Sequence, residues 1–210
     1  GHVDSLGEQR LAYLRGGRVD ANAATGHLFR ARRSRQGDIV NSRLWFHRGA
    51  PGEGHRDADY RAFQAAQAAR PAMLYVGGND DMLHGFAADT GAERLAYVPE
   101  GLHPHLAELT RPDYEHRYYV DGSPLVGDVR PEGRWRTYLA GFLGAGGRGY
   151  FMLDVTGPAQ FRSSGPAELV VLDTTARATP DPDVSPLLPN TICCTLQAVP
   201  QSSGMWLIRR

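Results

Sequence analysis

Histidines and serines are the first residues in this chain to consider for metal binding or catalysis. The eight histidines are scattered, and only His103 and His105 form a close pair, separated by Pro104. The proline favours a loop, and no zinc-ligand motif surrounds the pair, so we interpret both residues as part of a surface loop. His84 precedes Gly85 inside a short strand-like run, and we predict a structural histidine there rather than a catalytic base. Ser123 and the pair Ser163-Ser164 lie in no Gly-x-Ser-x-Gly elbow, so hydrolase chemistry is not indicated.

A glycine-rich run at residues 144–149 could be mistaken for a phosphate-binding loop. It leads into a strand-like segment and lacks the Lys-Ser/Thr that follows the glycines of such loops. Phosphate loops use the N-terminus of a helix, so we interpret the run as a turn. The sequence predicts no catalytic residue, no cofactor-binding residue and no metal-binding residue.

Aspartates near the ends of predicted strands are the last candidates for a site: Asp154, Asp173, Asp181 and Asp183. Clustered carboxylates at such places could hold calcium, which takes six to eight oxygen ligands. The alternate pair Asp181 and Asp183 has neither a glycine turn nor a following glutamate. We therefore predict that these aspartates cap turns, with a weak calcium site as the alternative.

Composition and charge exclude several classes of protein. The 210 residues contain 23 arginines and no lysine, balanced by 23 acidic residues, which removes the electrostatic case for nucleic acid or an anionic membrane as the main partner. No apolar run approaches the roughly 18 residues of a membrane helix, and the first residues show no export signal. The two cysteines, Cys193 and Cys194, are adjacent and define no disulfide framework.

Short strands joined by tight turns must position any site in this chain. Residues 8–35 read as surface loop with at most a short strand, and residues 59–69 as a short helix ended by Pro71. Residues 99–111 read as helical or irregular. Short runs rich in apolar residues, bounded by turn residues, predict strands at 37–46, 73–77, 82–86, 93–98, 118–120, 125–129, 135–142, 150–155 and 168–173.

Antiparallel meanders that recur about every 40–50 residues are typical of propeller blades. The predicted fold class is all-β: a partial β-propeller of about three blade-like meanders, with short helices in the inter-blade loops. We expect a loop-rich lead-in at 1–35, the propeller at 36–184 and a divergent tail at 185–210. The aromatic residues on the strands are predicted to pack mostly between blades: Trp45, Phe46, Tyr75, Tyr97, Tyr118, Tyr119, Trp135, Tyr138, Phe142, Tyr150 and Phe151.

Several stretches of the sequence are similar to one known family. AMLYVGGNDDMLHGFAADTG at 72–91, HRYYVDGSPLVGDV at 116–129 and YLAGFLGAGGRGYFMLDVT at 138–156 resemble the β-propeller of type IV pilus biogenesis factors of the PilY1/PilC type. Residues 37–46, 99–119 and 168–184 resemble the same family, in the family's order. The resemblance implies an exported protein at the outer membrane surface or on the pilus. It also implies a role in pilus extension and adhesion.

The sequence departs from the family pattern at several positions. The first turn resembles Asn-Asp-Gly in the family and is Asn79-Asp80-Asp81 here. Glycine accepts a left-handed backbone without strain, whereas aspartate does so at a cost of about 1 kcal/mol. Ala87 replaces a turn-capping aspartate, and Arg43 stands where the family suggests Ser or Pro. Family members can carry a calcium loop, but no such loop occurs here, so no calcium ligand is assigned.

The resemblance ends at Val184. Residues 185–210 contain both cysteines and show neither strand alternation nor turn residues in the expected places. We hypothesise that this tail is translated out of frame, since one codon choice read one base later gives a family-like segment. The alternative is a genuine variable end in which residues 187–196 pack as an edge element.

Together these features predict a non-catalytic pilus assembly and adhesion module without a cofactor. We expect its loops at 49–57, 99–116 and 157–167 to bind pilus components or a surface ligand, because long loops on a rigid scaffold carry recognition. A quinoprotein-dehydrogenase propeller is the enzymatic alternative, although Ala87 and Tyr97 stand at its expected Asp and Trp positions. A truncated product without independent function is the second alternative. An open ring would expose apolar faces and strand edges, which predicts aggregation.

Overall fold

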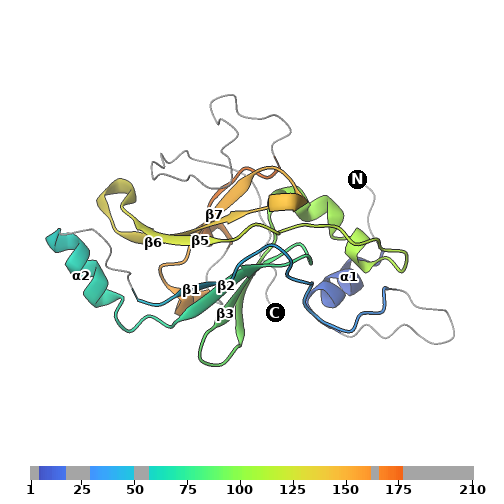
Figure 1. The fold of residues 1–210 in the computed structure, drawn as a ribbon, viewed down its shortest axis with the longest axis horizontal. Helices are drawn as coiled ribbons and strands as arrows, with labels where there is room; N and C mark the ends of the chain where they lie inside the picture. Colours follow the sequence, from blue (N-terminus) through green and yellow to red (C-terminus); the bar gives the residue numbers. More distant parts are fainter. Residues whose placement is uncertain (1–4, 18–28, 50–56, 162–165, 177–210) are drawn as a thin grey trace.

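Two four-stranded antiparallel sheets make up the fold in a computed structural model that describes residues 5–17, 29–49, 57–161 and 166–176. The first sheet has the order β1 (Trp45–His47), β2 (Met73–Gly77), β3 (Leu83–Ala87) and β4 (Glu93–Tyr97). The second has the order β5 (Leu125–Val129), β6 (Arg136–Phe142), β7 (Tyr150–Asp154) and β8 (Val170–Asp173). Figure 1 shows the two sheets lying one over the other.

This arrangement confirms the all-β partial propeller, with a different number of blades. About three meanders were expected, whereas the described residues form two four-stranded sheets. β1 pairs with β2 through Trp45↔Tyr75 and so completes the first blade. Each sheet is a simple meander in which every strand pairs with the next along the chain.

Two of the predicted strands are wrong over most of their length, and a third, 168–173, begins two residues too early, since β8 starts at Val170. Only the end of the segment 37–46 joins a strand, and residues 118–120 form none. In both places the backbone N–H groups bond to side chains instead of a neighbouring strand: Gly37 N–H donates to Asp80, and Tyr119 N–H to Asn79. Backbone groups bonded in this way have no need of a strand ladder.

Helices occupy the periphery of the two sheets. The expected loop at 8–35 contains α1 (Gly7–Leu14), so that prediction is wrong there; its Tyr13 and Leu14 are buried in the core. The predicted helix at 59–69 is confirmed as α2 (Ala58–Ala66). The remaining helices are short: α3 (Pro166–Leu169) and the 3-10 helices η1 (Glu100–His105), η2 (Glu108–Thr110), η3 (Pro131–Gly133), η4 (Gly144–Gly146) and η5 (Pro158–Gln160).

One continuous hydrophobic core joins the two sheets. Leu83, Leu139 and Leu153 are almost completely buried in it. Tyr97 of β4 and Phe151 of β7 meet across the sheets, with ring centroids 5.0 Å apart. Gly141 makes room for the Phe151 ring, because a Cβ at this glycine would lie 2.2 Å from a ring carbon.

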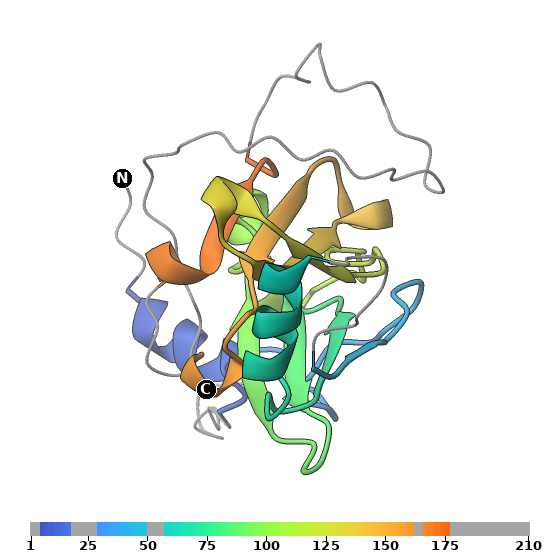
Figure 2. The same cartoon turned by 90° about the vertical axis from the view of Figure 1, so that its left-hand side faces the viewer.

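A smaller aromatic cluster attaches α2 at one end of the molecule. Tyr60 of α2 is 1% exposed and lies against Trp135, with ring centroids 4.6 Å apart. Phe63 also faces Trp135 in a stacked geometry. Figure 2 views the molecule from this end, with α2 in front of the sheets, and Figure 1 places α1 at the opposite end. No helix of the described residues is long and apolar enough to cross a membrane.

Candidate functional site

The segment 37–43 connects the two sheets and passes next to the turn between β2 and β3. At the first sheet, Gly37 N–H donates to Asp80 Oδ2 over 2.8 Å, and Asn79 N–H donates to the Asp38 carbonyl over 3.0 Å. Gly37 is required by this close approach, since a Cβ there would lie 2.5 Å from the Asp80 nitrogen. Tyr119 N–H donates to Asn79 Oδ1, so the same turn also holds the approach to β5.

The other end of this segment is bonded to the second sheet. Asn41 donates from its backbone N–H (3.1 Å) and its side-chain amide (2.6 Å) to the two oxygens of Asp121. Arg43 N–H donates to the hydroxyl of Ser123 over 2.9 Å. The segment therefore ties both blades together through charged and polar side chains rather than through strand pairing.

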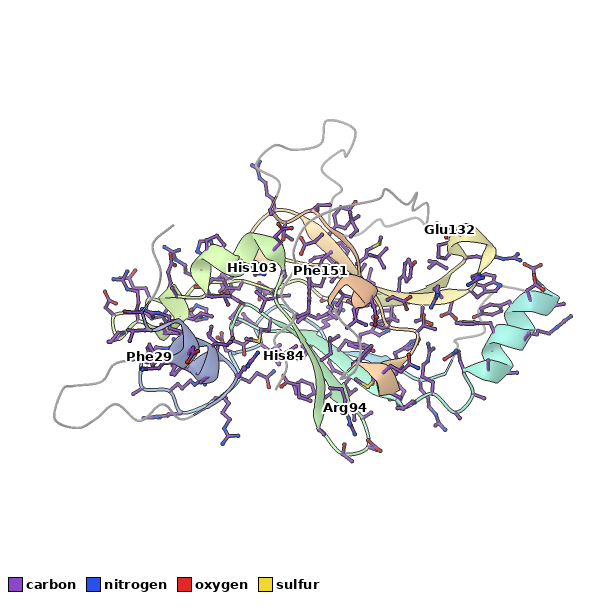
Figure 3. The ribbon with its side chains drawn as sticks, turned by 180° about the vertical axis from the view of Figure 1, so that it is seen from behind. Phe29, His84, Arg94, His103, Glu132 and Phe151 are labelled. Carbon is purple, nitrogen blue, oxygen red and sulfur yellow. The ribbon has the colours of Figure 1, made fainter. Side chains whose placement is uncertain are left out.

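The turn cluster, formed by Asp80, Asp81, His84 and Glu93, lies beside this connection. His84 is completely buried, with Nε2 2.9 Å from Asp80 Oδ1 and Nδ1 2.7 Å from Glu93 Oε1. Both ring nitrogens therefore donate to carboxylates, which requires the charged imidazolium. Burial by itself would lower the pKa of His84, but the charge and hydrogen bond of Asp80, together with those of Glu93, raise it to about 9. Figure 3 labels His84 in the middle of the molecule.

Asp81 is the strained member of the turn cluster. Its φ is 69°, in the left-handed region expected from the Asn-Asp-Gly turn of the family. The side chain is fully buried, and neither carboxyl oxygen has a hydrogen-bond partner among the described residues. Burial, and then the charges of Asp80 and Glu108, raise the pKa of Asp81 to about 8, so this carboxyl is neutral at pH 7.

A second polar group, the arginine network of His47, Arg70, Asp128 and Thr137, lies between β1 and the second sheet. Arg70 is 8% exposed and donates to Thr137 Oγ1 and His47 Nε2, each over 2.6 Å, and to the Gly49 carbonyl. Thr137 donates in turn to Asp128 Oδ1 over 2.6 Å, and Tyr60 of α2 donates to Asp128 Oδ2 over 2.8 Å. The network thus fixes both blades and α2 around one guanidinium.

His47 is neutral in this network. Its Nε2 accepts from Arg70, so this nitrogen carries no proton. Burial, and then the charge of Arg70, lower the pKa of His47 to about 4, against the opposing effect of Asp128. In both polar groups the buried cation, His84 or Arg70, is hydrogen-bonded to other parts of the scaffold.

Most of the residues weighed in the sequence have structural roles in the described part of the chain. His84 is the structural histidine expected. Asp154 and Asp173 cap turns, as predicted: each accepts from a threonine two residues later, with Asp173 also accepting from Tyr97 and the Glu100 N–H. The glycine run is a turn that includes η4. Asp181, Asp183, Ser163, Ser164, Cys193 and Cys194 lie outside the described residues.

No candidate metal site emerges from the described residues, where no group of three His, Cys, Asp or Glu side chains is placed to hold an ion. His103 and His105 lie in η1, a 3-10 helix, rather than in an irregular loop. His105 instead lies 3.5 Å from Glu108, and both side chains are more than a third exposed.

The aromatic residues divide between core and surface. Tyr75, Tyr97, Tyr119 and Phe151 are buried, in agreement with packing between the blades. Phe46 and Tyr118 are 56% and 41% exposed, so the prediction is wrong for these two, and Trp135 packs on α2. Phe46 is exposed because it lies on the opposite face of β1 from the buried His47.

Of the three loops expected to bind a partner, only 99–116 is described completely. Its first half is anchored, since Glu100 N–H donates to Asp173 and Gly101 N–H to Thr175. Residues 111–118, which begin inside this loop and end two residues beyond it, are exposed except for the half-buried Tyr114. Residues 50–56 and 162–165 of the other two loops lie outside the described residues.

The sequence reasoning missed Arg70 and the connecting role of the segment 37–43. Arg70 follows an alanine-rich helix and reads as one more exposed arginine in a chain with 23 of them. The signal at 37–43 was the combination of a glycine with Asp38, Asn41 and Ser42, which favours side-chain to backbone bonds over a strand.

Comparison with known proteins places the two-blade fold in a family. The family model described as the PilY1 beta-propeller domain matches residues 36–177. A type IV pilus biogenesis factor PilY1 homolog of Xylella fastidiosa is 42% identical over 165 residues, which are 75% of this chain and 14% of the relative. The type IV pilus biogenesis factor PilY1 of Pseudomonas aeruginosa strain PAK is 41% identical over 171 residues, 76% of this chain and 14% of its own length.

A solved structure also matches part of the chain. The crystal structure of the Pseudomonas aeruginosa PilY1 C-terminal domain shares 45% sequence identity, with a TM-score of 0.38, over 48% of this chain and 19% of that structure. The chain spans about one-seventh of the length of the two relatives above. With a family model that covers residues 36–177 and relatives about 40% identical over three-quarters of its length, this chain belongs to the PilY1 β-propeller family.

Proposed function

We propose that this chain acts as a propeller segment of a type IV pilus biogenesis factor, exported and associated with the pilus or the outer membrane surface. The observation that carries this proposal is the family match over 36–177, which includes every strand of both sheets. The two relatives from Xylella fastidiosa and Pseudomonas aeruginosa described above are named as type IV pilus biogenesis factors.

The module works by binding and assembly rather than by catalysis. Two of its buried cations are engaged in the scaffold: His84 bonds to two carboxylates within the first sheet, and Arg70 bonds to three acceptors and joins the two sheets. Its exposed inter-blade loop at 111–118 offers charged and aromatic side chains to a pilus component or a surface ligand. Loops of this kind on a rigid scaffold commonly carry recognition.

A chimera tests the proposal. Residues 36–177 replace the matching region of PilY1 in a Pseudomonas aeruginosa strain that lacks its own copy, and surface pili are counted by electron microscopy. We expect pili to return. A chimera that reaches the cell surface in normal amount but restores no pili would contradict the proposed function.

Two variants of the chimera serve as controls. Gly141→Val places a side chain where Phe151 lies, since even a Cβ would be 2.2 Å from the ring, so this variant is expected to lose both fold and pili. Arg94→Gln changes an exposed residue and is expected to behave as the parent chimera does.

The two alternatives predicted from the sequence have tests of their own. The quinoprotein-dehydrogenase alternative is tested by incubating the chain with pyrroloquinoline quinone and calcium and then measuring the absorbance of bound quinone. A cooperative melt of a monomeric full-length chain would contradict a product without independent function, because an open set of blades with exposed apolar surface is expected to aggregate. Adhesion is tested separately, by attachment of the chimera strain to a surface.

A further inference from the structure

An excess of positive charge gathers at the end of the molecule that carries α1. The described residues 5–17 and 29–36 include six arginines and one acidic residue, Glu8. The two segments lie together, because the Tyr13 hydroxyl donates to the Arg30 carbonyl over 2.9 Å. Phe29, which packs against Tyr13, marks this end in Figure 3, far from Glu132. The balanced net charge of the whole chain therefore conceals a local excess.

Three of these arginines have structural roles. Arg10 donates to Thr110 and lies over the Phe29 ring, and Arg30 stacks on Tyr114 with its guanidinium carbon 4.1 Å from the ring centroid. Arg32 lies 3.9 Å over the Tyr13 ring and donates to the Tyr13 carbonyl. Aromatic faces and carbonyl oxygens hold these guanidiniums without neutralising their charge.

The other three, Arg15, Arg33 and Arg35, are exposed and form what we call the arginine face. Arg35 lies over Gly16, since a Cβ at that glycine would be 3.3 Å from Arg35 Cδ, and this places Arg35 beside Arg15. Arg33 follows Arg32, which is fixed on Tyr13. The three exposed arginines therefore lie on the surface near the end of α1. No ion pair among the described residues occupies their guanidiniums.

Three acidic residues of the described segments that follow Arg35 or lie between the start of η2 and β5 are already paired with basic residues. Asp38 lies 2.9 Å from His116, Asp113 lies 2.7 Å from Arg111, and Glu108 lies 3.1 Å from Arg117. Glu8 is in the first turn of α1, about 10 Å along the helix axis from Arg15 at a rise of 1.5 Å per residue. Within the described residues, no acidic side chain is paired with the arginine face.

We propose that the arginine face is a docking surface for an acidic segment of a partner protein. Guanidinium groups bind carboxylates through paired, parallel hydrogen bonds, which lysine cannot form. A lipid surface fits less well, because only three arginines of this end are exposed, fewer than the clusters of about four to eight basic residues that recognise anionic lipids. Duplex DNA fits less well too, since it is typically held by about six to ten phosphate contacts. This surface would bind an acidic partner whether or not the chain takes part in pilus assembly.

Binding of a labelled oligoglutamate peptide to the full-length chain, measured by fluorescence anisotropy at low and at physiological salt, tests the proposal. The chain is expected to bind, and more weakly as salt rises. The triple variant Arg15→Gln/Arg33→Gln/Arg35→Gln is expected to lose about tenfold or more in affinity. The matched control Arg94→Gln/Arg134→Gln/Arg148→Gln removes the same charge from exposed positions elsewhere and is expected to change affinity less than about threefold. Figure 3 shows Arg94 well away from Phe29.

Three results would overturn the proposal. One is the absence of binding by the unaltered chain, and another is an equal loss in both triple variants, which would indicate attraction by net charge alone. The third is a preference for phosphatidylserine vesicles or for DNA over the peptide. Melting curves of both variants should match that of the unaltered chain, because all six side chains are exposed.

Discussion

His84 and His47 are both buried on strands of the first sheet, yet their surroundings give them opposite charge states. In the turn cluster, His84 donates to Asp80 and Glu93, and its pKa rises to about 9. In the arginine network, His47 accepts from Arg70, and its pKa falls to about 4. Burial disfavours the charged form at both sites, so the neighbours decide the outcome.

The two regions therefore stabilise different parts of the fold by different means: the turn cluster lies within the first sheet, whereas the arginine network joins the two sheets. The turn cluster depends on a buried ion pair whose carboxylates would lose their cationic partner if His84 were replaced. In the arginine network, the direct partners of the cation are uncharged: a hydroxyl, a carbonyl and a neutral imidazole. The loss of a buried charge partner costs more than the loss of a neutral one, and this difference sets the order of the predictions that follow.

Replacement of His84 by leucine is expected to have the largest effect. His84→Leu leaves Asp80 and Glu93 buried without their cation, so the free energy of unfolding should fall by about 3–5 kcal/mol. Urea unfolding at pH 7, followed by tryptophan fluorescence, measures this. His116→Leu is the control, because it removes a histidine that pairs with the half-exposed Asp38 and should cost less than about 1 kcal/mol. Equal losses in both variants would show that the buried pair gives no special stability.

Replacement of Arg70 by methionine should cost less. Arg70→Met keeps much of the apolar stem and leaves mainly neutral acceptors without a donor, so we expect a loss of about 2–3 kcal/mol. The same unfolding measurement applies, with Arg94→Met as the control at an exposed position, where the change should stay within about 0.5 kcal/mol. A loss as large as that of His84→Leu would mean that the charge of Asp128, rather than the neutral acceptors, dominates the network.

Asp81→Gly is expected to stabilise the protein by about 1–3 kcal/mol at pH 4, because it removes a left-handed aspartate and a buried carboxyl without a hydrogen-bond partner. The pKa of Asp81 is raised from 3.8 to about 8, so its ionisation opposes folding progressively more as pH rises between these values. The stabilisation should therefore grow from pH 4 to pH 8 and then level off. Thermal melts across this range measure it.

Asp81→Asn separates the two causes. It keeps the side chain in the left-handed backbone and removes only the ionisation, so it should reproduce the growth with pH and little of the gain at pH 4. A gain for Asp81→Gly that is the same at every pH would contradict the raised pKa and leave backbone strain as the whole effect.

Asp81 also shows what the sequence could predict. The φ of 69° follows from local turn chemistry, because a family turn of Asn-Asp-Gly already indicates a left-handed third residue. The strands β2 to β7 could be predicted for the same reason, since short alternating runs between turn residues depend on local pattern. Burial of the Asp81 carboxyl could not, because it depends on segments far away in the chain that cover the turn.

The errors share a physical cause. The segment 37–43 and residues 118–120 read as strands, but their N–H groups bond to Asp80, Asp121 and Asn79, whose positions only the folded chain defines. The helix α1 was not predicted because it lies in an arginine-rich stretch, and its own Arg10 packs on the Phe29 ring, a contact that no local pattern indicates. Arg70 and His47 are 23 residues apart in sequence, and no local pattern predicts their contact.

His47→Gln should have the smallest effect at pH 7 and the clearest dependence on pH. The glutamine carbonyl can still accept from Arg70, so the free energy of unfolding at pH 7 should change by about 1 kcal/mol or less.

Because the pKa of His47 is lowered from 6.5 to about 4, the neutral histidine contributes stability that is present above pH 6.5 and lost as pH falls toward 4. His84 has the opposite sign: its contribution is present below pH 6.5 and lost as pH rises through 9. The variant should therefore lose less stability than the unaltered chain between pH 6.5 and 4, with the alkaline side unchanged. If the free energies of unfolding of the variant and of the unaltered chain fell in parallel between pH 6.5 and 4, His47 would be protonated in the folded state over this range. The contrast between the two histidines would then not hold.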